Sequence, residues 1–118
     1  MNSAEFKSRT MEYALQVIEL VEELPRTRTA DVIGRQLLRS GTSVGANYRA
    51  ACRAKSDADF ISKMGTVEEE ADESVYWMEL LMRRQIVSQE RTIELMSEGD
   101  QIVAMTVASI KTARNKKR

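Results

Sequence analysis

The sequence contains no histidine, and its 118 residues include only one cysteine, one proline and five glycines. Without histidine, the chain lacks the side chain that most often acts as a general base near neutral pH. Cys52 cannot form a disulfide within the chain, so we expect a small buried thiol and a reducing, cytoplasmic location. So few glycines and prolines leave few turns, which excludes a fold rich in strands.

Long apolar runs are also missing. No run approaches the roughly 18 apolar residues of a membrane span, and the N-terminal residues, with Glu5 among them, do not resemble a signal peptide. Hydrophobic residues make up 42% of the chain but aromatic residues only 5%, so aliphatic side chains must build the core, as in helical proteins. We therefore expect a soluble, all-α protein with a single domain over residues 1–118, no cofactor and no evident small-molecule substrate.

The net charge is zero, but the charged residues are unevenly distributed along the chain. Residues 1–25 carry two basic and five acidic side chains, and residues 26–63 carry eight basic and three acidic side chains. Residues 64–100 carry three basic and ten acidic side chains, and residues 101–118 carry five and none. The segments therefore alternate in sign, and each resulting surface can attract a partner of opposite charge.

Apolar residues recur every three or four positions in four segments, as helices with one buried side require. Pro25 ends the first helix, Thr29 is the expected cap of the second, Ser56 with Asp59 predicts a capping box for the third, and Ser88 precedes the fourth. The predicted helices span about residues 4–24, 30–54, 57–85 and 89–114, with a basic tail at 115–118. Because the connections are short, we expect an up-down-up-down antiparallel four-helix bundle.

The second predicted helix has three distinct sides, at about 100° per residue. Its core side contains Ile33, Leu37, Ser40, Val44, Tyr48 and Ala51. Gly41 and Gly45 share a neighbouring side, where close packing of another helix would compensate for the roughly 1 kcal/mol that each glycine costs relative to Ala. Ser43 and Asn47 flank the core side, and we expect them to form hydrogen bonds between helices.

The third side of this helix carries Arg35, Arg39, Arg49 and Arg53 within an arc of about 80°. At about 1.5 Å per residue the stripe would be roughly 27 Å long, enough to meet several phosphates. Guanidinium groups bind phosphates in bidentate fashion, so the stripe is a candidate nucleic-acid-binding site. Alternatively, these arginines pair with the acidic side of the third helix, within the protomer or across an interface, or they remain solvated.

Tyr76 and Leu80 lie opposite the buried side of the third predicted helix, among Glu69, Asp72 and Glu73. Apolar groups on an otherwise acidic outer side predict a second contact surface, which suits an oligomer. The three carboxylates are also the only plausible metal ligands. Carboxylate metal sites in bundles combine glutamate with a histidine three residues later, and this chain has no histidine, so we expect no metal site.

Several motifs resemble one known family. They are Gly41-Thr42-Ser43-Val44-Gly45-Ala46-Asn47-Tyr48, then Asp59-Phe60-Ile61, then Glu69-Glu70-Ala71-Asp72-Glu73-Ser74-Val75-Tyr76-Trp77. Together they resemble the four helix bundle protein family, also called the 23S ribosomal RNA intervening-sequence protein family. The segment 108–114 looks like that family's closing segment, so the resemblance covers about residues 6–114. Ser43-x-x-x-Asn47 is its most specific part.

The resemblance implies a bacterial cytoplasmic protein whose four-helix protomers assemble into a ring of five. Members of this family are encoded within intervening sequences of ribosomal RNA genes or stand alone in genomes, and most have no established biochemical activity. A related group, the accessory variability proteins of diversity-generating retroelements, similarly forms pentamers and binds reverse transcriptase and nucleic acid. Those relatives are usually strongly basic, whereas this chain is neutral.

Two classes of function follow from these observations. The first is a non-enzymatic scaffold or binding module, whose oligomer presents charged surfaces to a protein or RNA partner. A more specific version of this hypothesis is that the protein binds nucleic acid through the arginine stripe. The second is an enzyme or metal-binding bundle using Glu69, Asp72 and Glu73, which the missing histidines disfavour.

Overall fold

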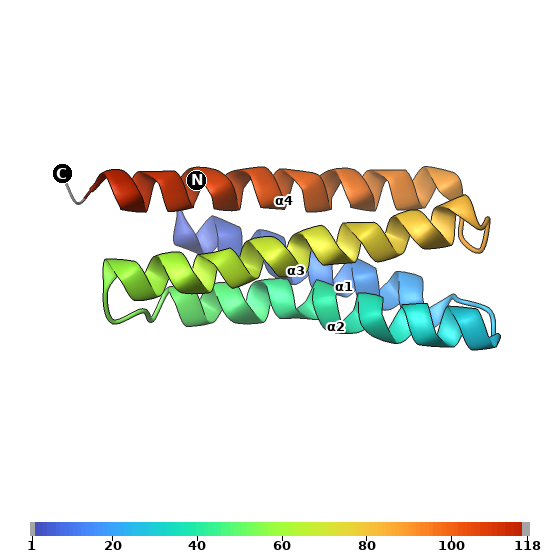
Figure 1. Ribbon diagram of the computed structural model, residues 1–118. Helices are drawn as coiled ribbons and strands as arrows, with labels where there is room; N and C mark the ends of the chain where they lie inside the picture. Colours follow the sequence, from blue (N-terminus) through green and yellow to red (C-terminus); the bar gives the residue numbers. More distant parts are fainter. Residues whose placement is uncertain (1, 117–118) are drawn as a thin grey trace.

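The computed structural model describes residues 2–116 and contains no strand among them. Its four helices are α1 (Ser3–Glu22), α2 (Arg28–Ala51), α3 (Asp57–Arg83) and α4 (Gln89–Asn115). Figure 1 shows the helices side by side along one long axis, with the chain turning back at each loop. The extents of 51 × 22 × 20 Å match the length of a helix of this size, at about 1.5 Å per residue, plus its loops. The predictions of an all-α fold and of four helices are confirmed.

Polar side chains begin three of the helices by accepting backbone hydrogen bonds. Asn2 accepts from the backbone N–H of Glu5 at 2.8 Å, and the Glu5 carboxylate accepts from that of Asn2 at 3.0 Å. This capping box was not predicted, although Asn-x-x-Glu is a recognisable signal for it. Ser56 caps α3 by accepting from the N–H of Asp59 at 3.0 Å. The Asp59 carboxylate, however, accepts from Lys55 at 3.1 Å rather than from Ser56, so the predicted capping box of α3 is only half formed.

Both predicted ends of α2 are wrong. Thr27, and not Thr29, is the N-cap, because its extended backbone (φ −121°, ψ 161°) lets its hydroxyl accept from the N–H of Ala30. Thr29 lies in the first helical turn instead. At the other end α2 stops at Ala51 rather than near residue 54, since the chain must turn before the next cap at Ser56.

α3 and α4 begin at Asp57 and Gln89, as predicted. The start of α1 and the C-terminal ends of α1, α3 and α4 differ from the prediction by one or two residues. α1 and α3 end two residues early, at Glu22 and Arg83. After α3, Gln85 adopts φ 59°, and the N–H groups of Gln85 and Ile86 donate back into the last turn in a Schellman arrangement. Asn115 of the predicted basic tail still belongs to α4 and Lys116 caps it, while residues 117 and 118 lie outside the described part of the chain.

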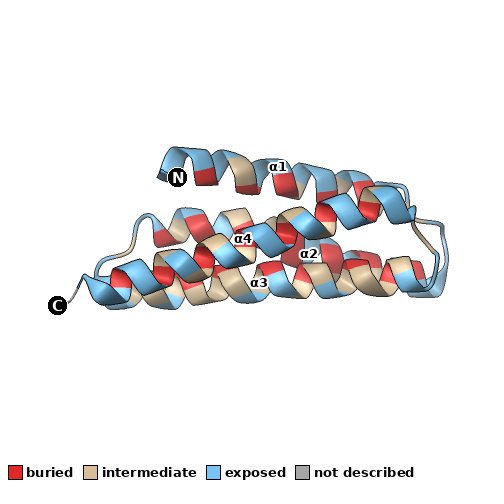
Figure 2. Cartoon of the chain, turned by 90° about the horizontal axis from the view of Figure 1, so that it is seen from above, coloured by how far each residue is buried: buried red, intermediate tan, exposed pale blue. Residues whose placement is uncertain are grey.

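One core contains buried residues from all four helices. Figure 2 shows these buried residues at intervals along each helix, between exposed ones. Val44 is completely buried, so the core side of α2 faces inward. Ile33, which was expected on that side, is only partly buried.

The packing between the helices is uneven. α2 with α3, α3 with α4, and α1 with α2 pack most closely, whereas α1 and α4 pack least closely of the neighbouring pairs. Two arginines link α1 to α4. Arg9 of α1 donates to both carboxylate oxygens of Glu98, at 2.6 and 2.9 Å. Arg91 of α4 bridges Glu19 and Glu23, so polar side chains hold this edge of the bundle together.

Candidate interaction surfaces

The predicted arginine stripe is only partly formed. Arg35 and Arg49 are exposed on α2, but Arg53 follows the end of the helix at Ala51, so the expectation of four arginines along one helix is wrong at that residue. Arg35 donates to Asp31 within α2 at 2.8 Å. Arg49 and Arg53 have no hydrogen-bond or ion-pair partner within residues 2–116. They are the part of the stripe that remains available to an anion.

Arg39 instead joins α2 to α3. Its guanidinium donates to the two carboxylate oxygens of Glu70, at 3.1 and 3.3 Å, and also to Glu73. Glu73 in turn accepts from the indole N–H of Trp77 at 2.9 Å. Of the alternatives left open by the sequence, Arg39 therefore takes the pairing with the acidic side of α3 within the protomer.

Gly41 and Gly45 lie where α1 crosses α2. A Cβ atom on Gly41 would be 2.8 Å from a methyl carbon of Val17, and one on Gly45 would be 3.2 Å from the hydroxyl oxygen of Thr10. Both glycines thus allow the backbones of α1 and α2 to approach closely. Since Val17 and Thr10 of α1 already pack against these two glycines, the glycines provide no separate docking surface.

Ser43 and Asn47 do not connect helices. The hydroxyl of Ser43 donates to the carbonyl oxygen of Arg39 at 2.6 Å, and the side-chain amide of Asn47 donates to that of Ser43 at 2.8 Å. The prediction of interhelical hydrogen bonds is therefore wrong. Short polar side chains on a helix often bond to the carbonyl one turn earlier, because that group is already in place.

Tyr13 is a buried polar residue that the sequence analysis did not identify. Its hydroxyl is 2.7 Å from that of Ser74 on α3. On α4, a Cβ atom at Gly99 would lie 2.7 Å from the same hydroxyl, so the glycine makes room for it. Burial raises the pKa of Tyr13 to about 12, although the hydrogen bond between Tyr13 and Ser74 opposes the shift.

Cys52 is exposed, and the expectation of a buried thiol is wrong. The reason is the early end of α2 at Ala51, which places Cys52 in the loop. Tyr48 lies one turn before it and packs edge-on against Phe6, with ring centroids 4.6 Å apart. Burial, together with a hydrogen bond to Cys52, raises the pKa of Tyr48 to about 12.

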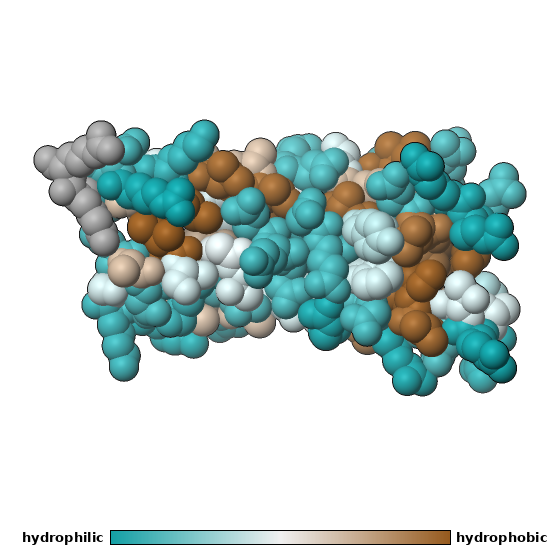
Figure 3. All heavy atoms as spheres, viewed as in Figure 1, coloured by the Kyte–Doolittle hydropathy of each residue, from teal (hydrophilic) through white to brown (hydrophobic). Residues whose placement is uncertain are grey.

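The outer side of α3 combines apolar and acidic residues. Tyr76 is 54% exposed, Leu80 is partly exposed, and Glu69 and Asp72 are exposed around them. Val32, at the start of α2, is 55% exposed. Figure 3 shows hydrophobic residues gathered towards the right-hand end of this face, where α2 begins and α3 ends.

No group of three or more metal-binding side chains comes together within residues 2–116. The carboxylate of Glu73 already accepts hydrogen bonds from Arg39 and Trp77, whereas those of Glu69 and Asp72 are exposed. The three candidate ligands therefore do not form a site. In this part of the chain no helix is sufficiently long and apolar to cross a membrane.

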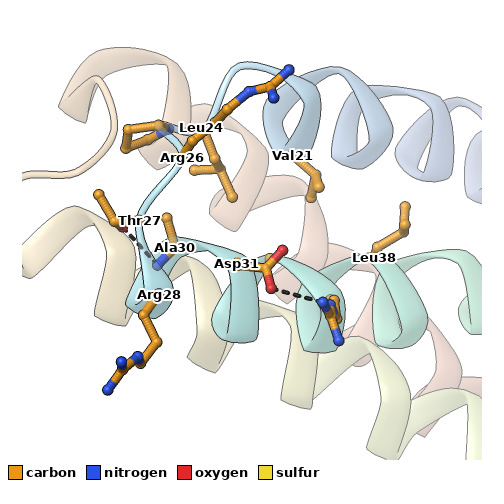
Figure 4. Close-up of a pocket in the computed structure, with 11 residues that line it drawn as sticks. Val21, Leu24, Arg26, Thr27, Arg28, Ala30, Asp31 and Leu38 are labelled. Atoms are coloured by element: carbon orange, nitrogen blue, oxygen red, sulfur yellow. Dashed lines mark hydrogen bonds and ion pairs between the residues drawn. The ribbon is translucent and has the colours of Figure 1, made fainter.

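A hollow of about 580 Å³ lies between the end of α1 and the start of α2. In Figure 4 the side chain of Val21 points down from α1 and that of Leu38 points up from α2 into the space between the helices. Leu24 adds a third aliphatic side chain. Arg26 and Arg28 stand at the edge and extend outward. We call this hollow the α1–α2 groove.

These features define a class of protein: a four-helix protein with charged and apolar surfaces on its outer sides and no metal-ligand cluster among residues 2–116. The chain belongs to the 23S rRNA-intervening sequence protein family, which it matches over residues 3–108. The resemblance found in the sequence motifs is thereby confirmed, although the match ends at residue 108 and includes little of the segment 108–114.

The chain is also similar to a protein of unknown function from the S23 ribosomal protein family of Bacteroides thetaiotaomicron, whose crystal structure is known. The two sequences are 35% identical, the similarity covers 94% of this chain and 99% of the other, and the TM-score is 0.87. No curated protein matches the chain. Neither the family description nor this structure names an activity.

Proposed function

We propose that this protein is a cytoplasmic, non-enzymatic bundle that self-associates and serves as a scaffold or binding module for a macromolecular partner. The observation that carries the proposal is the exposure of large apolar side chains on two separate outer sides. Met11 and Leu15 on α1 are 50% and 52% exposed, Val32 on α2 is 55% exposed, and Tyr76 on α3 is 54% exposed. Apolar patches surrounded by polar residues are typical of interaction surfaces.

The proposed protomer is an up-down-up-down antiparallel bundle, and the proposed assembly is the ring of five that the family resemblance implies. Two different apolar surfaces on one protomer favour head-to-tail contacts, which produce a closed ring when the rotation between neighbours closes. Contacts between identical surfaces would instead favour a dimer.

Light scattering on the purified protein tests the proposal. We expect a mass of five times the 13.4 kDa protomer, and we expect Tyr76→Glu to lower it, because a charge would have to be buried in the contact. Ser97→Glu is the matched control, since it adds the same charge at an exposed polar position on α4. A protein that is monomeric at every concentration would contradict the proposal.

Nucleic-acid binding is a second candidate function, favoured by the guanidinium groups of Arg49 and Arg53, which have no ion-pair partner in the described residues 2–116. RNA or DNA should then bind in about 50 mM salt, with affinity that falls steeply as salt rises. Arg49→Gln with Arg53→Gln should weaken binding and lower the salt dependence by about one counterion per lost phosphate contact. Arg83→Gln on α3 is the control. Absence of binding in low salt would exclude this function.

A further inference from the structure

The α1–α2 groove has an apolar floor that the bundle leaves uncovered. Leu38 remains 37% exposed, and the hollow of about 580 Å³ beside it falls within the usual range for binding sites. Gly34 lies beneath the groove, where a Cβ atom would be 2.8 Å from a methyl group of Leu24. Close packing of α1 on α2 therefore shapes the floor, and an apolar side chain of moderate size fits above it.

The edge of the groove is basic at the end where α2 begins. Arg26 and Arg28 are exposed, and neither has an ion-pair or hydrogen-bond partner in the described part of the chain. Further along, Arg35 is paired with Asp31 at 2.8 Å. This ion pair adds little net charge to the groove. A complementary surface should therefore carry carboxylates at one end and apolar side chains at the other.

The outer side of α3 has this composition, and we call the part from Glu69 to Leu80 the acidic strip. Glu69 and Asp72 are exposed and have no ion-pair partner within residues 2–116. Tyr76 and Leu80 follow at one-turn intervals after Asp72. The ring of Tyr76 packs edge-on against Trp77, with centroids 5.2 Å apart, so a positioned aromatic side chain projects from the strip.

The lengths of the two surfaces also agree. At about 1.5 Å per residue, the groove spans roughly 15 Å of α2 from Arg28 to Leu38, and the strip spans roughly 16 Å of α3 from Glu69 to Leu80. Pairing the opposite charges places Leu80 next to Leu38. In this alignment α3 of one copy runs in the same direction as α2 of the other.

We propose that the α1–α2 groove of one copy receives the acidic strip of a second copy. The inference rests on the proposed self-association and assigns the contact to the groove beside Leu38 and to the strip around Tyr76. Since the groove and the strip lie on different sides of the protomer, each contact leaves a free groove on one copy and a free strip on the other. Apolar contacts hold the pair together and the charged ends set its direction. Contacts of this kind continue until a ring closes.

A complementation experiment tests this pairing. Leu38→Asp damages only the groove, and Tyr76→Glu damages only the strip, so each variant alone should lose the oligomer. Mixed in equal amounts, they should form a dimer that joins the intact strip of the first variant to the intact groove of the second. Circular dichroism and melting curves show whether both remain folded, as expected for residues 37% and 54% exposed.

Three other outcomes separate the hypotheses. If Leu38→Asp keeps the oligomer while Tyr76→Glu loses it, the groove is not the partner surface and this inference fails, although self-association stands. If both variants lose the oligomer but their mixture forms no dimer, the pairing of groove with strip is also wrong. If the unmodified protein is monomeric, the proposed function fails together with the inference, and the groove would have to serve another acidic, amphipathic partner.

Disulfide cross-linking checks the direction independently, with Cys52→Ser as the background. One chain carries Leu38→Cys and another carries Leu80→Cys, so that any mixed disulfide joins two copies. Oxidation of the mixture should give a cross-linked dimer, because a disulfide needs Cα atoms within about 7 Å. Arg28→Cys mixed with Leu80→Cys is the control and should cross-link much less. Preferential cross-linking of the control pair, or no cross-link in an intact oligomer, would overturn the alignment.

Discussion

Gly99 and Gly65 both lie within helices, but their surroundings differ. A Cβ atom on Gly99 would lie 2.6 Å from a methyl carbon of Val75 and 2.7 Å from the hydroxyl of Tyr13. A Cβ atom on Gly65 of α3 would meet nothing within 4 Å. Periodicity in the sequence cannot distinguish them, because it marks both only as weak helix formers.

Substitution of each glycine by alanine should therefore change the free energy of unfolding in opposite directions. Gly65→Ala should stabilise the protein by about 1 kcal/mol, through helix propensity alone. Gly99→Ala gains the same propensity but overpacks the core, which costs about 1–3 kcal/mol, so we expect no gain or a net loss. Urea unfolding curves measure both. If Gly99→Ala stabilised the protein as much as Gly65→Ala, the side chains around Gly99 would have to move aside without a loss of stability, and this prediction would be wrong.

Tyr13 predicts a loss of stability at alkaline pH. Its pKa in the folded protein is about 12, above the value near 10 expected in the unfolded chain. The neutral hydroxyl is favoured by the fold, so its contribution is complete below about pH 10 and is lost as the pH rises towards 12. Tyr13→Phe should reduce this loss, measured as melting temperature against pH. A Tyr13→Phe variant that loses as much stability above about pH 10 as the unsubstituted protein would contradict this account.

At the level of single residues, the sequence predicts which side chains face outward better than it predicts their partners. The guanidinium group of Arg39 could bind a phosphate by its chemistry alone. Only the structure shows that α3 lies close enough to α2 for Glu70 and Glu73 to pair with it. The side-chain amide of Asn47 donates to the carbonyl oxygen of Ser43, one turn earlier on the same helix, rather than to another helix. These choices depend on distances that a spacing pattern does not contain.

The helices themselves follow from their apolar periodicity, whereas their ends depend on local backbone geometry. Thr27 and Thr29 are equally good caps by residue type, and the extended conformation of Thr27 decides between them. At the end of α3, Gln85 adopts a left-handed conformation that residue type would assign to glycine or asparagine. The sequence therefore predicts α3 too long by two residues.

The end of α3 predicts a stabilising substitution. Gln85→Gly should raise the free energy of unfolding by about 1 kcal/mol, because φ 59° costs a residue with a side chain roughly 1–2 kcal/mol and glycine much less. Ala104→Gly is the control, since it places glycine at an exposed position inside α4 and should cost about 1 kcal/mol. A destabilised Gln85→Gly variant would mean that the side chain of Gln85 makes a compensating contact.

Across the whole molecule, α1 is attached by two different kinds of contact. On one side Gly41 and Gly45 let it pack closely against α2. On the other side, where α1 packs least closely, Arg9 and Arg91 form ion pairs between α1 and α4. Since α1 also supplies Val21 to the groove, the order of α1 and the proposed assembly are linked.

The edge between α1 and α4 should therefore open first. Arg9→Met combined with Arg91→Met should increase hydrogen exchange in α1 more than in α2 or α3, because few other contacts hold that side of α1. The control is Arg83→Met, whose ion pair with Glu79 lies within α3 and is 75% exposed on the arginine side, so its loss should have little effect. Equal exchange in all four helices would indicate global unfolding instead. Selective opening of α1 should also weaken the groove, so the double variant should assemble less well than Arg83→Met at the same protein concentration.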